Sequence, residues 1–297
     1  MGFSYANIPW KKAVLSVEQF TRDDISELFN LAKVIGSFQK PLSGKVLTNL
    51  FYEPSTRTSS SFYSAMVRLG GNAIPINEVH YSSVSKGETL EDTIRTLECY
   101  SDIIVLRHSD EFAALRAYNI SEIPIINAGN GVGEHPTQAL LDLYTILKEH
   151  KKIDGLNITL MGDLKHGRTV HSLTNLLRLY DVKLSFVSPE SLSIPEEYTR
   201  NGDSFYTHLQ DVIVETDILY VTRVQKERIA NGVSIDMSYS VTKDDMKRAK
   251  EDMVLMHPLP RVGEIPTELD DDPRSAYFRQ MKYGLYVRMA LLYCMLT

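Results

Sequence analysis

The chain has 297 residues, which is long for one ordinary domain and suits two α/β domains. Hydrophobic residues make up 43% and charged residues 24%, and the net charge of −6 leaves no basic excess to neutralise nucleic-acid phosphates. With only Cys99 and Cys294, a disulfide framework and a thiolate zinc site are disfavoured. No apolar run is long enough to span a bilayer and the first residues lack the apolar centre of a signal peptide, so we expect a cytoplasmic protein.

Short apolar runs alternate with longer segments of helical periodicity, which is the pattern of parallel βαβ units. Strands are predicted at 46–52, 101–108, 123–129, 157–164, 182–188, 217–223 and 253–259. Helices are predicted at 57–70, 135–150, 167–181 and 281–296. The fold class that we expect is therefore α/β, with two domains that are each a mostly parallel sheet flanked by helices.

The charged, glycine-containing segment 149–157 separates a long helix from a new strand and is the best candidate for a domain boundary. Ligands of open parallel sheets lie beyond the carboxyl ends of the strands, so the polar residues at those ends are the candidates for function. The division that we predict is a first domain of residues 1–134 plus 284–297, an interdomain helix 135–149, and a second domain of residues 150–283.

The first candidate is the run Ser55-Thr56-Arg57-Thr58, which follows a strand and Pro54 and opens a helix. Backbone N–H groups at a helix start, hydroxyl donors and a guanidinium together suit a phosphate. A serine N-cap beside a solvated arginine is the more common use of such residues. Taken alone, the run favours phosphate only slightly.

The stretch GNGVGEHPTQ (129–138) has the spacing G-x-G-x-G and so lacks the dinucleotide fingerprint. Pro136 suits the first turn of a helix, which puts His135 at the helix N-terminus and Gln138 one turn further on the same face. There the helix dipole disfavours imidazolium, so His135 is expected to be a neutral donor to a carbonyl. A capping histidine without chemistry is an equally good interpretation of this motif alone.

The stretch GDLKHGRTVHS (162–172) has the glycine spacing of a P-loop, but Arg168 stands where lysine is needed and the loop residues are bulky. These departures weaken the hypothesis of nucleotide binding, while Arg168 remains suited to pairing with a carboxylate. Three further motifs are TRVQKER (222–228), HPLPR (257–261) and the polar loop YSSVSKGETLED (81–92). By composition alone these are a solvated loop, a rigid turn and a surface loop.

Together and in this order, the motifs STRT, SSVSKGET, VLRH, HPTQ, GDLKHGRTVHS, TRVQKER and HPLPR resemble the transcarbamoylases over nearly the whole chain. HPLP and TRVQKER resemble the aspartate branch rather than the ornithine branch. The resemblance implies a two-domain fold with the active site in the crevice between the domains. It implies transfer of the carbamoyl group of carbamoyl phosphate to the amine of L-aspartate, in pyrimidine biosynthesis, with no cofactor and no metal.

Each site residue follows from the matching motif. The resemblance implies catalytic roles for Thr58, Arg107, His135 and Lys86. It implies carbamoyl phosphate binding by Ser55, Thr56, Arg57, Thr58, Ser82, Lys86, Arg107, His135, Gln138, Pro258 and Leu259. It implies aspartate binding by Lys86, Arg168, Arg223 and Gln225, and bracing of a closed form by Glu53 and Arg228.

The loop with Ser82 and Lys86 resembles one that reaches the neighbouring subunit, so a homotrimer with shared active sites is implied. No nucleic-acid, membrane or regulatory partner is assigned. The chain departs from many relatives at Ser59, where they carry a second arginine. The alternative is a catalytically silent homologue that binds a ligand or a partner, and a P-loop-like nucleotide-binding protein ranks third.

Overall fold

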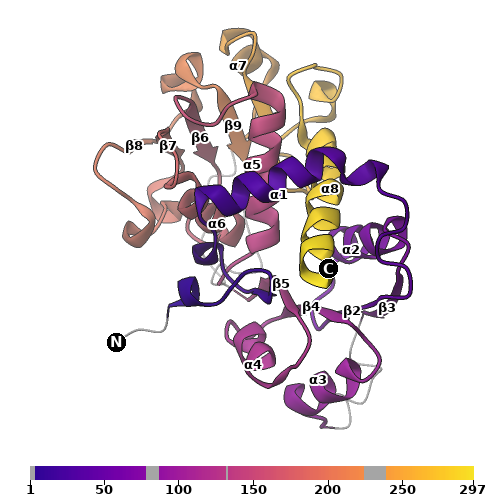
Figure 1. Ribbon diagram of the computed structural model, residues 1–297. Helices are drawn as coiled ribbons and strands as arrows, with labels where there is room; N and C mark the ends of the chain where they lie inside the picture. Colours follow the sequence, from indigo (N-terminus) through magenta and orange to yellow (C-terminus); the bar gives the residue numbers. More distant parts are fainter. Residues whose placement is uncertain (1–3, 78–86, 132, 224–238) are drawn as a thin grey trace. The chain divides into compact units, whose positions relative to one another are not determined.

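The computed structural model of the chain describes residues 4–77, 87–131, 133–223 and 239–297. The chain forms two compact units (Figure 1). The first comprises Met1–Leu141 and Lys282–Thr297, and the second comprises Asp142–Met281. The division falls inside two long helices, α5 (Pro136–His150) and α8 (Tyr277–Leu296), so each of these helices contributes residues to both units.

The first unit is built on a five-stranded sheet in which every pairing is parallel. Its strands are short and buried at the centre, as expected for a sheet that is covered on both faces. In spatial order they are β1 (Ala13–Val14), β5 (Ile125–Asn130), β4 (Ile103–His108), β2 (Val46–Phe51) and β3 (Asn72–Asn77).

Helices cover both faces of this sheet (Figure 1). On one face lie α3 (Leu90–Glu98) and α4 (Ala113–Ile120), which pack on each other and on β4. On the other face α2 (Thr56–Arg68) packs along β2 and β3. The remaining helical segments are α1 (Arg22–Val34) and the 3-10 turns Tyr5–Asn7, Val17–Gln19 and Ile35–Ser37.

The last residues of α8 are anchored in the first unit by specific contacts. The Arg288 guanidinium lies 5.1 Å from the centre of the Phe62 ring of α2, and Tyr293 packs edge-on against Phe38 at 5.4 Å. Gly284 has no room for a side chain, because an added Cβ would lie 2.8 Å from Leu141.

The second unit repeats the plan with another five-stranded, wholly parallel sheet. In spatial order its strands are β10 (Val254–Met256), β9 (Ile218–Val221), β6 (Asn157–Met161), β7 (Lys183–Val187) and β8 (Ser204–Tyr206). Its further helical segments are α6 (Arg168–Leu177), α7 (Lys243–Arg248) and the 3-10 turns Glu190–Leu192, Glu196–Tyr198, Leu209–Asp211, Ile213–Glu215 and Thr267–Leu269.

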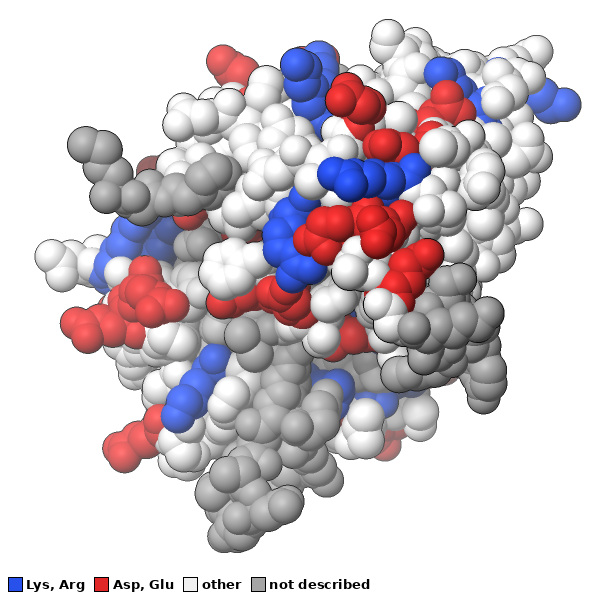
Figure 2. All heavy atoms as spheres, turned by 90° about the horizontal axis from the view of Figure 1, so that it is seen from below, with Lys and Arg blue, Asp and Glu red and all other residues white. Residues whose placement is uncertain are grey.

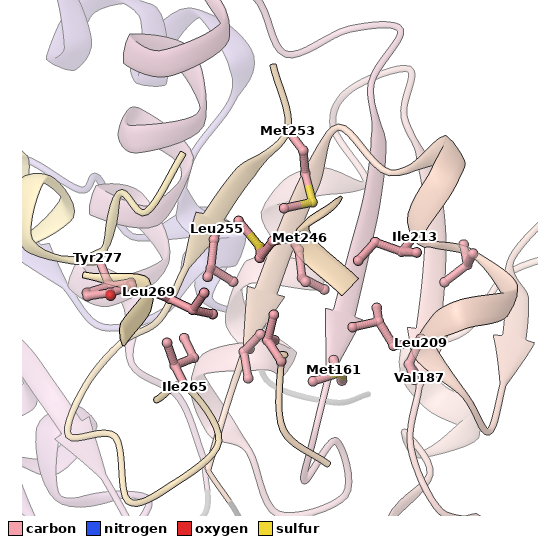
Figure 3. Packing of buried hydrophobic residues seen from close by; sticks show 14 residues of the cluster. Met161, Val187, Leu209, Ile213, Met246, Met253, Leu255, Ile265, Leu269 and Tyr277 are labelled. Atoms are coloured by element: carbon pink, nitrogen blue, oxygen red, sulfur yellow. The ribbon is translucent and has the colours of Figure 1, made fainter. Parts of the chain in front are cut away.

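One hydrophobic cluster packs the last segments of this unit against its sheet (Figure 3). Strand residues Met161, Val187 and Leu255 meet Met246 of α7 and Tyr277 at the start of α8. All of these side chains are at least 98% buried, as are Ile265 and Leu269 of the segment between β10 and α8, so apolar packing holds that segment on the sheet.

In each sheet the order of strands reverses direction at one point. In the first unit the chain moves from β2 outward to β3 and then returns to β4 on the other side of β2. In the second unit it moves from β6 outward to β7 and β8 and then returns to β9 beside β6. Ligands of open parallel sheets bind beyond the carboxyl ends of the strands at such a reversal. The two expected ligand positions are therefore the ends of β2 and β4, and the ends of β6 and β9.

The expected fold class is confirmed, because both units are parallel sheets flanked by helices. Each of the seven predicted strands is present, and the largest difference is at β10, which ends at Met256 because His257 already belongs to a hydrogen-bonded turn. The strands without a sequence prediction, β1, β3 and β8, are short or half-exposed edge strands and so lack a strong apolar signal.

Charges of both signs are interspersed on the face that Figure 2 shows, with basic side chains lying beside acidic ones. Among the ion pairs of the described residues, Arg116 pairs with Glu91 and with Asp110, each at 2.8 Å. The described residues of this face therefore present no broad positive field to a polyanion. Within the described residues, no helix is long and apolar enough to cross a membrane.

An ion pair ties the turn after β10 to the start of α8, and it generates a pH-dependent prediction. Arg261 donates to Asp270 through Nη2 at 2.7 Å, and the Tyr277 hydroxyl also donates to this carboxylate. The hydrogen bonds from Arg261 and Tyr277 lower the pKa of Asp270 from 3.8 to about 2. A lowered carboxylate pKa stabilises the fold above pH 4, and the contribution is lost as the pH falls towards 2.

We predict that Asp270→Asn lowers the free energy of unfolding of the second unit by about 1 kcal/mol at pH 7, because the charged hydrogen bonds to Arg261 and Tyr277 are lost. The loss is no larger because the pair is partly exposed and solvent screens it. The difference from the unsubstituted protein shrinks as the pH falls below 4. Urea unfolding at pH 7, 5 and 3.5 measures it, with Asp244→Asn as a control in an exposed ion pair with Lys247. Equal effects of the two substitutions, or a difference that does not depend on pH, would contradict the prediction.

Candidate functional site

The start of α2 differs from the other described helix starts that have a Ser or Thr at the N-cap. The N-cap hydroxyls of Thr21, Thr89 and Thr242 each accept a hydrogen bond from a backbone N–H of the first turn. Ser55 occupies the same N-cap position at α2 in an extended conformation, but its side chain makes no capping bond. The first N–H groups of a helix have no partner within the helix, so this start combines a positive helix end with an uncommitted hydroxyl. Such an arrangement suits an anion.

The side chains of the STRT run lie at different depths. Thr56 and Arg57 are exposed and Ser55 is half-buried, whereas Thr58 is only 5% exposed. The exposed Arg57 therefore projects from the first turn of the helix, within reach of a ligand that approaches from solvent. Thr58 faces the inside of the unit.

Ser59, the position that departs from many relatives, holds α2 on the sheet. The Asn49 side chain in β2 donates through Nδ2 to the Ser59 carbonyl at 3.0 Å, and the Ser59 hydroxyl donates to Oδ1 of Asn77 at the end of β3 at 3.0 Å. Ser59 is only 5% exposed. The serine thus binds the first turn of α2 to two strands. The sequence did not point to either partner, because a single asparagine in a strand, buried as at Asn49 or exposed as at Asn77, has no motif.

Arg107 lies beside the same helix start. In the sheet register Phe51 of β2 pairs with Arg107 of β4, and the Tyr52 N–H donates to the Arg107 carbonyl at 2.8 Å. The Arg107 side chain is 17% exposed and its Nε lies 3.3 Å from Oε2 of Glu53. The register of β2 and β4, at the reversal of the first sheet, therefore puts Arg107 opposite the strand end from which the chain continues to Ser55 and α2.

His135 and Gln138 follow the neighbouring strand β5, at the turn that leads into α5 and on the first turn of α5. His135 is 5% exposed and directly precedes α5, and Gln138 is 6% exposed on the first turn. The turn before them is fixed by Glu134, whose carboxylate accepts from the Ser16 hydroxyl at 2.5 Å and from the Val17 N–H at 2.9 Å. The prediction of His135 at a helix N-terminus is correct. Glu134, which positions it, has no signal in the sequence.

In the second unit, Arg168 and Arg223 follow β6 and β9, the two strands at the reversal. The close approach of these strand ends requires glycine at position 162, where φ is +120° and an added Cβ would lie 2.1 Å from the Thr222 carbonyl oxygen. Arg168 opens α6 and is 7% exposed, whereas Arg223 is half-buried. A glycine-mediated approach of two strand ends thus brings two arginines to one edge of the sheet.

The loop before Arg168 is held by hydrogen bonds of its own side chains. Asp163 is fully buried and accepts from the His166 N–H at 3.0 Å, with the His166 ring also within 3.1 Å. The His171 side chain contacts the Leu164 carbonyl at 2.8 Å, and burial lowers the pKa of that imidazole. A loop fixed by its own side chains, in place of backbone N–H groups that converge on a ligand, disfavours the P-loop interpretation.

Pro258 and Leu259 follow β10, the strand beside β9, and both are half-buried. Leu259 has a φ of +56°, which is the left-handed region and costs about 1–2 kcal/mol for a residue with a side chain. Glu264, which closes this turn, was missed by sequence reasoning. Ser82, Lys86, Gln225 and Arg228, which the sequence also predicts, lie outside the described residues. Among the residues that are described, no group of three or more His, Cys, Asp or Glu could hold a metal ion.

Both units thus belong to the class of doubly wound parallel α/β proteins, with basic and hydroxyl side chains at the reversals of strand order. Two family profiles match the chain. One is described as "Aspartate/ornithine carbamoyltransferase, carbamoyl-P binding domain" and covers residues 12–148, and the other as the "Asp/Orn binding domain" of the same proteins and covers residues 154–295.

The chain is also similar to curated proteins over almost its whole length. It is 49% identical to the aspartate carbamoyltransferase catalytic subunit of Thermoplasma acidophilum, over 95% of this chain and 97% of that protein. It is 49% identical to the multifunctional protein pyr1-3 of Dictyostelium discoideum, of which it spans only 13%.

Among solved structures, aspartate transcarbamoylase from Trypanosoma cruzi in complex with carbamoyl phosphate superposes with a TM-score of 0.92 at 43% identity, covering 97% of this chain and 96% of that one. The same enzyme in complex with carbamoyl phosphate and aspartate has a TM-score of 0.90 at 44% identity, with the same coverage. The chain belongs to the aspartate/ornithine carbamoyltransferase family.

The uncommitted hydroxyl of Ser55 generates a prediction that separates binding from stability. Ser55→Ala changes the free energy of unfolding by less than about 0.5 kcal/mol, because no capping bond is lost. It weakens inorganic phosphate binding about tenfold, because a hydrogen bond to an anion is lost. Thr21→Ala, at a helix start that is capped, costs about 1 kcal/mol and leaves phosphate binding unchanged.

Thermal unfolding and phosphate titration by calorimetry measure both quantities for the two variants. A loss of stability in Ser55→Ala as large as that in Thr21→Ala would show that Ser55 is an ordinary cap. Unchanged phosphate affinity would remove Ser55 from the site.

Proposed function

We propose that the protein transfers the carbamoyl group of carbamoyl phosphate to the amine of L-aspartate, giving N-carbamoyl-L-aspartate and phosphate, the committed step of pyrimidine biosynthesis. The single observation that carries the proposal is the pairing of an uncapped helix start with Arg107 at the reversal of the first sheet. Family membership supports it, as do the reported complexes of the Trypanosoma cruzi enzyme with both substrates.

The phosphate of carbamoyl phosphate binds at the start of α2. The first-turn N–H groups, the hydroxyls of Ser55 and Thr56 and the guanidinium of Arg57 supply its donors. Arg107 adds a second cation from the neighbouring strand. Individually placed donors of this kind bind a small anion on a chain whose net charge is −6.

The carbamoyl carbonyl oxygen is held by Thr58, Arg107 and His135, which are all buried or nearly so. Attack of the aspartate amine on the carbonyl carbon gives a tetrahedral intermediate whose oxygen is anionic. Donors fixed at that oxygen stabilise the intermediate without reorganisation, because packing and hydrogen bonds already hold them. Gln138 and the backbone carbonyls of Pro258 and Leu259 hold the amide nitrogen.

Collapse of the intermediate breaks the bond between the carbonyl carbon and the phosphate oxygen. The leaving phosphate accepts the proton that the attacking amine loses, so the chemistry balances without a protein base. The contribution of the protein is then orientation of two bound substrates together with the electrostatic effect of the donors.

Aspartate brings two carboxylates, and Arg168 and Arg223 supply two cations at one edge of the second sheet. Guanidinium groups suit this role because each can pair with a carboxylate through two parallel hydrogen bonds. Gln225 and Lys86 complete the aspartate site in this proposal. An ornithine acceptor would need an acidic partner for its side-chain amine instead.

The test is product formation. Incubation with carbamoyl phosphate and L-aspartate should yield N-carbamoyl-L-aspartate and one equivalent of phosphate, and L-ornithine in place of aspartate should yield no citrulline. Chromatography of both products measures this directly. Binding of carbamoyl phosphate without any product would support the silent homologue instead, and citrulline formation would support the ornithine branch.

The proposal includes a cytoplasmic homotrimer in which Ser82 and Lys86 of one subunit complete the site of the next. Arg57→Ala and Lys86→Ala proteins, each inactive alone, should then regain part of the activity when they are mixed and reassembled, because some mixed trimers contain one intact site. The activity of the mixture against that of each parent measures this. No recovery despite confirmed subunit exchange would exclude shared sites.

A further inference from the structure

The His257 side chain lies at the centre of the turn that follows β10. It is fully buried, and its two ring nitrogens have different partners. The Leu259 N–H donates to Nδ1 at 2.8 Å, and Nε2 lies 2.8 Å from Oε1 of Glu264. Because Nδ1 accepts a hydrogen bond, the ring proton belongs on Nε2, which donates to Glu264.

Glu264 is itself fixed by the turn. Its second oxygen, Oε2, accepts from the Val262 N–H at 2.8 Å. Burial alone would raise the pKa of Glu264, but hydrogen bonds from His257 and from backbone N–H groups outweigh it, and the pKa lies below its ordinary value. The carboxylate therefore stays ionised and holds the imidazole in one orientation and one tautomer.

The backbone of His257 is held from the opposite side. Its N–H donates to Oε1 of Gln280 at 3.1 Å, and the Gln280 amide donates to Asp142 at 2.6 Å. The second oxygen of Asp142 accepts from the Tyr220 hydroxyl at 2.9 Å. All four residues are buried, so the imidazole is a rigid support for what it binds.

The hydrogen bond from Leu259 to His257 sets the direction of a carbonyl group. The N–H of Leu259 and the C=O of Pro258 belong to one planar trans peptide and point in opposite directions. An N–H that is held towards the buried imidazole therefore turns the Pro258 carbonyl away from it. The φ of +56° at Leu259 is unfavourable for leucine, so this orientation depends on the contact that holds it.

We propose that His257 and Glu264 are positioning residues that make the site selective for a carbamoyl phosphate over an acyl phosphate. The inference rests on the proposed function, in which the Pro258 and Leu259 carbonyls accept hydrogen bonds from the carbamoyl nitrogen. Acetyl phosphate has a methyl group in place of that NH₂ group, so it cannot donate to a carbonyl. Inorganic phosphate lacks the group altogether.

The experiment compares these three ligands in the assembled enzyme. For each variant, the KM of carbamoyl phosphate is measured together with the inhibition constants of acetyl phosphate and of inorganic phosphate. The ratio of the acetyl phosphate constant to the KM reports selectivity for the NH₂ group. A general loss of structure weakens all three ligands alike, whereas a misdirected carbonyl weakens carbamoyl phosphate alone.

Two substitutions of His257 separate its two contacts. In His257→Asn the amide oxygen takes the place of Nδ1 and can still accept from Leu259, so selectivity should stay within about threefold of the original value. In His257→Gln the longer side chain reaches Glu264 but leaves the Leu259 N–H without its acceptor, so selectivity should fall roughly tenfold. Inorganic phosphate should bind both variants within about twofold of the original protein.

Control substitutions use exposed residues of the same unit. His208→Gln repeats the histidine change at an exposed position and should leave the ratio unchanged. Glu264→Ala should lower the ratio, whereas Glu268→Ala, in an exposed ion pair with Lys243, should not. The Glu264 pair keeps the test decisive if His257→Gln does not fold.

Equal selectivity of His257→Asn and His257→Gln, or parallel changes for all three ligands, would overturn the inference. The proposed function is judged separately. If the unsubstituted protein forms no carbamoyl aspartate, the proposed function is wrong. If it forms carbamoyl aspartate but the variants keep full selectivity, only the positioning role is wrong.

Discussion

The backbone N–H groups at the start of an α-helix have no partner inside the helix, and at α2 the N-cap serine does not take them up. This start follows the buried strand β2 at the point where the order of the first sheet reverses. Because β2 and β4 are parallel neighbours, the end of β4 with Arg107 lies at the same edge of the sheet as the end of β2. The anion site that we propose is thus a property of backbone and topology, which the Ser-Thr-Arg-Thr side chains complete.

In the second unit the reversal of strand order also carries positive charge, but arginine side chains supply it in place of backbone N–H groups. Gly162 allows the ends of β6 and β9 to approach closely, and Arg168 and Arg223 follow those two strands. The positive charge is therefore local in both units, while the protein as a whole carries a net charge of −6. Local charge of this kind favours small dianions over nucleic acid, because a polyanion needs a continuous basic surface.

The sequence predicted the strands that are buried on both faces, because continuous apolar runs such as 46–52 have no other stable placement. It also placed STRT, Arg107, His135 and Arg168 at strand ends or helix starts, where they lie. The residues that hold these groups were not predictable. Glu134 contacts Ser16 and Ser59 contacts Asn77, and such partners come from distant parts of the chain and form no motif. The edge strands were not predicted either, because β1 has only two residues and the partly exposed β3 and β8 lack the apolar pattern.

The central claim is that the phosphate group of the substrate sits on the uncapped start of α2. A crystal structure of the protein with carbamoyl phosphate tests it most directly. We predict that the phosphate oxygens lie within hydrogen-bond distance of the backbone N–H groups of residues 56–58 and of the Ser55 hydroxyl. A phosphate found instead at the turn before Arg168 would contradict the account and would favour a P-loop-like site in the second unit.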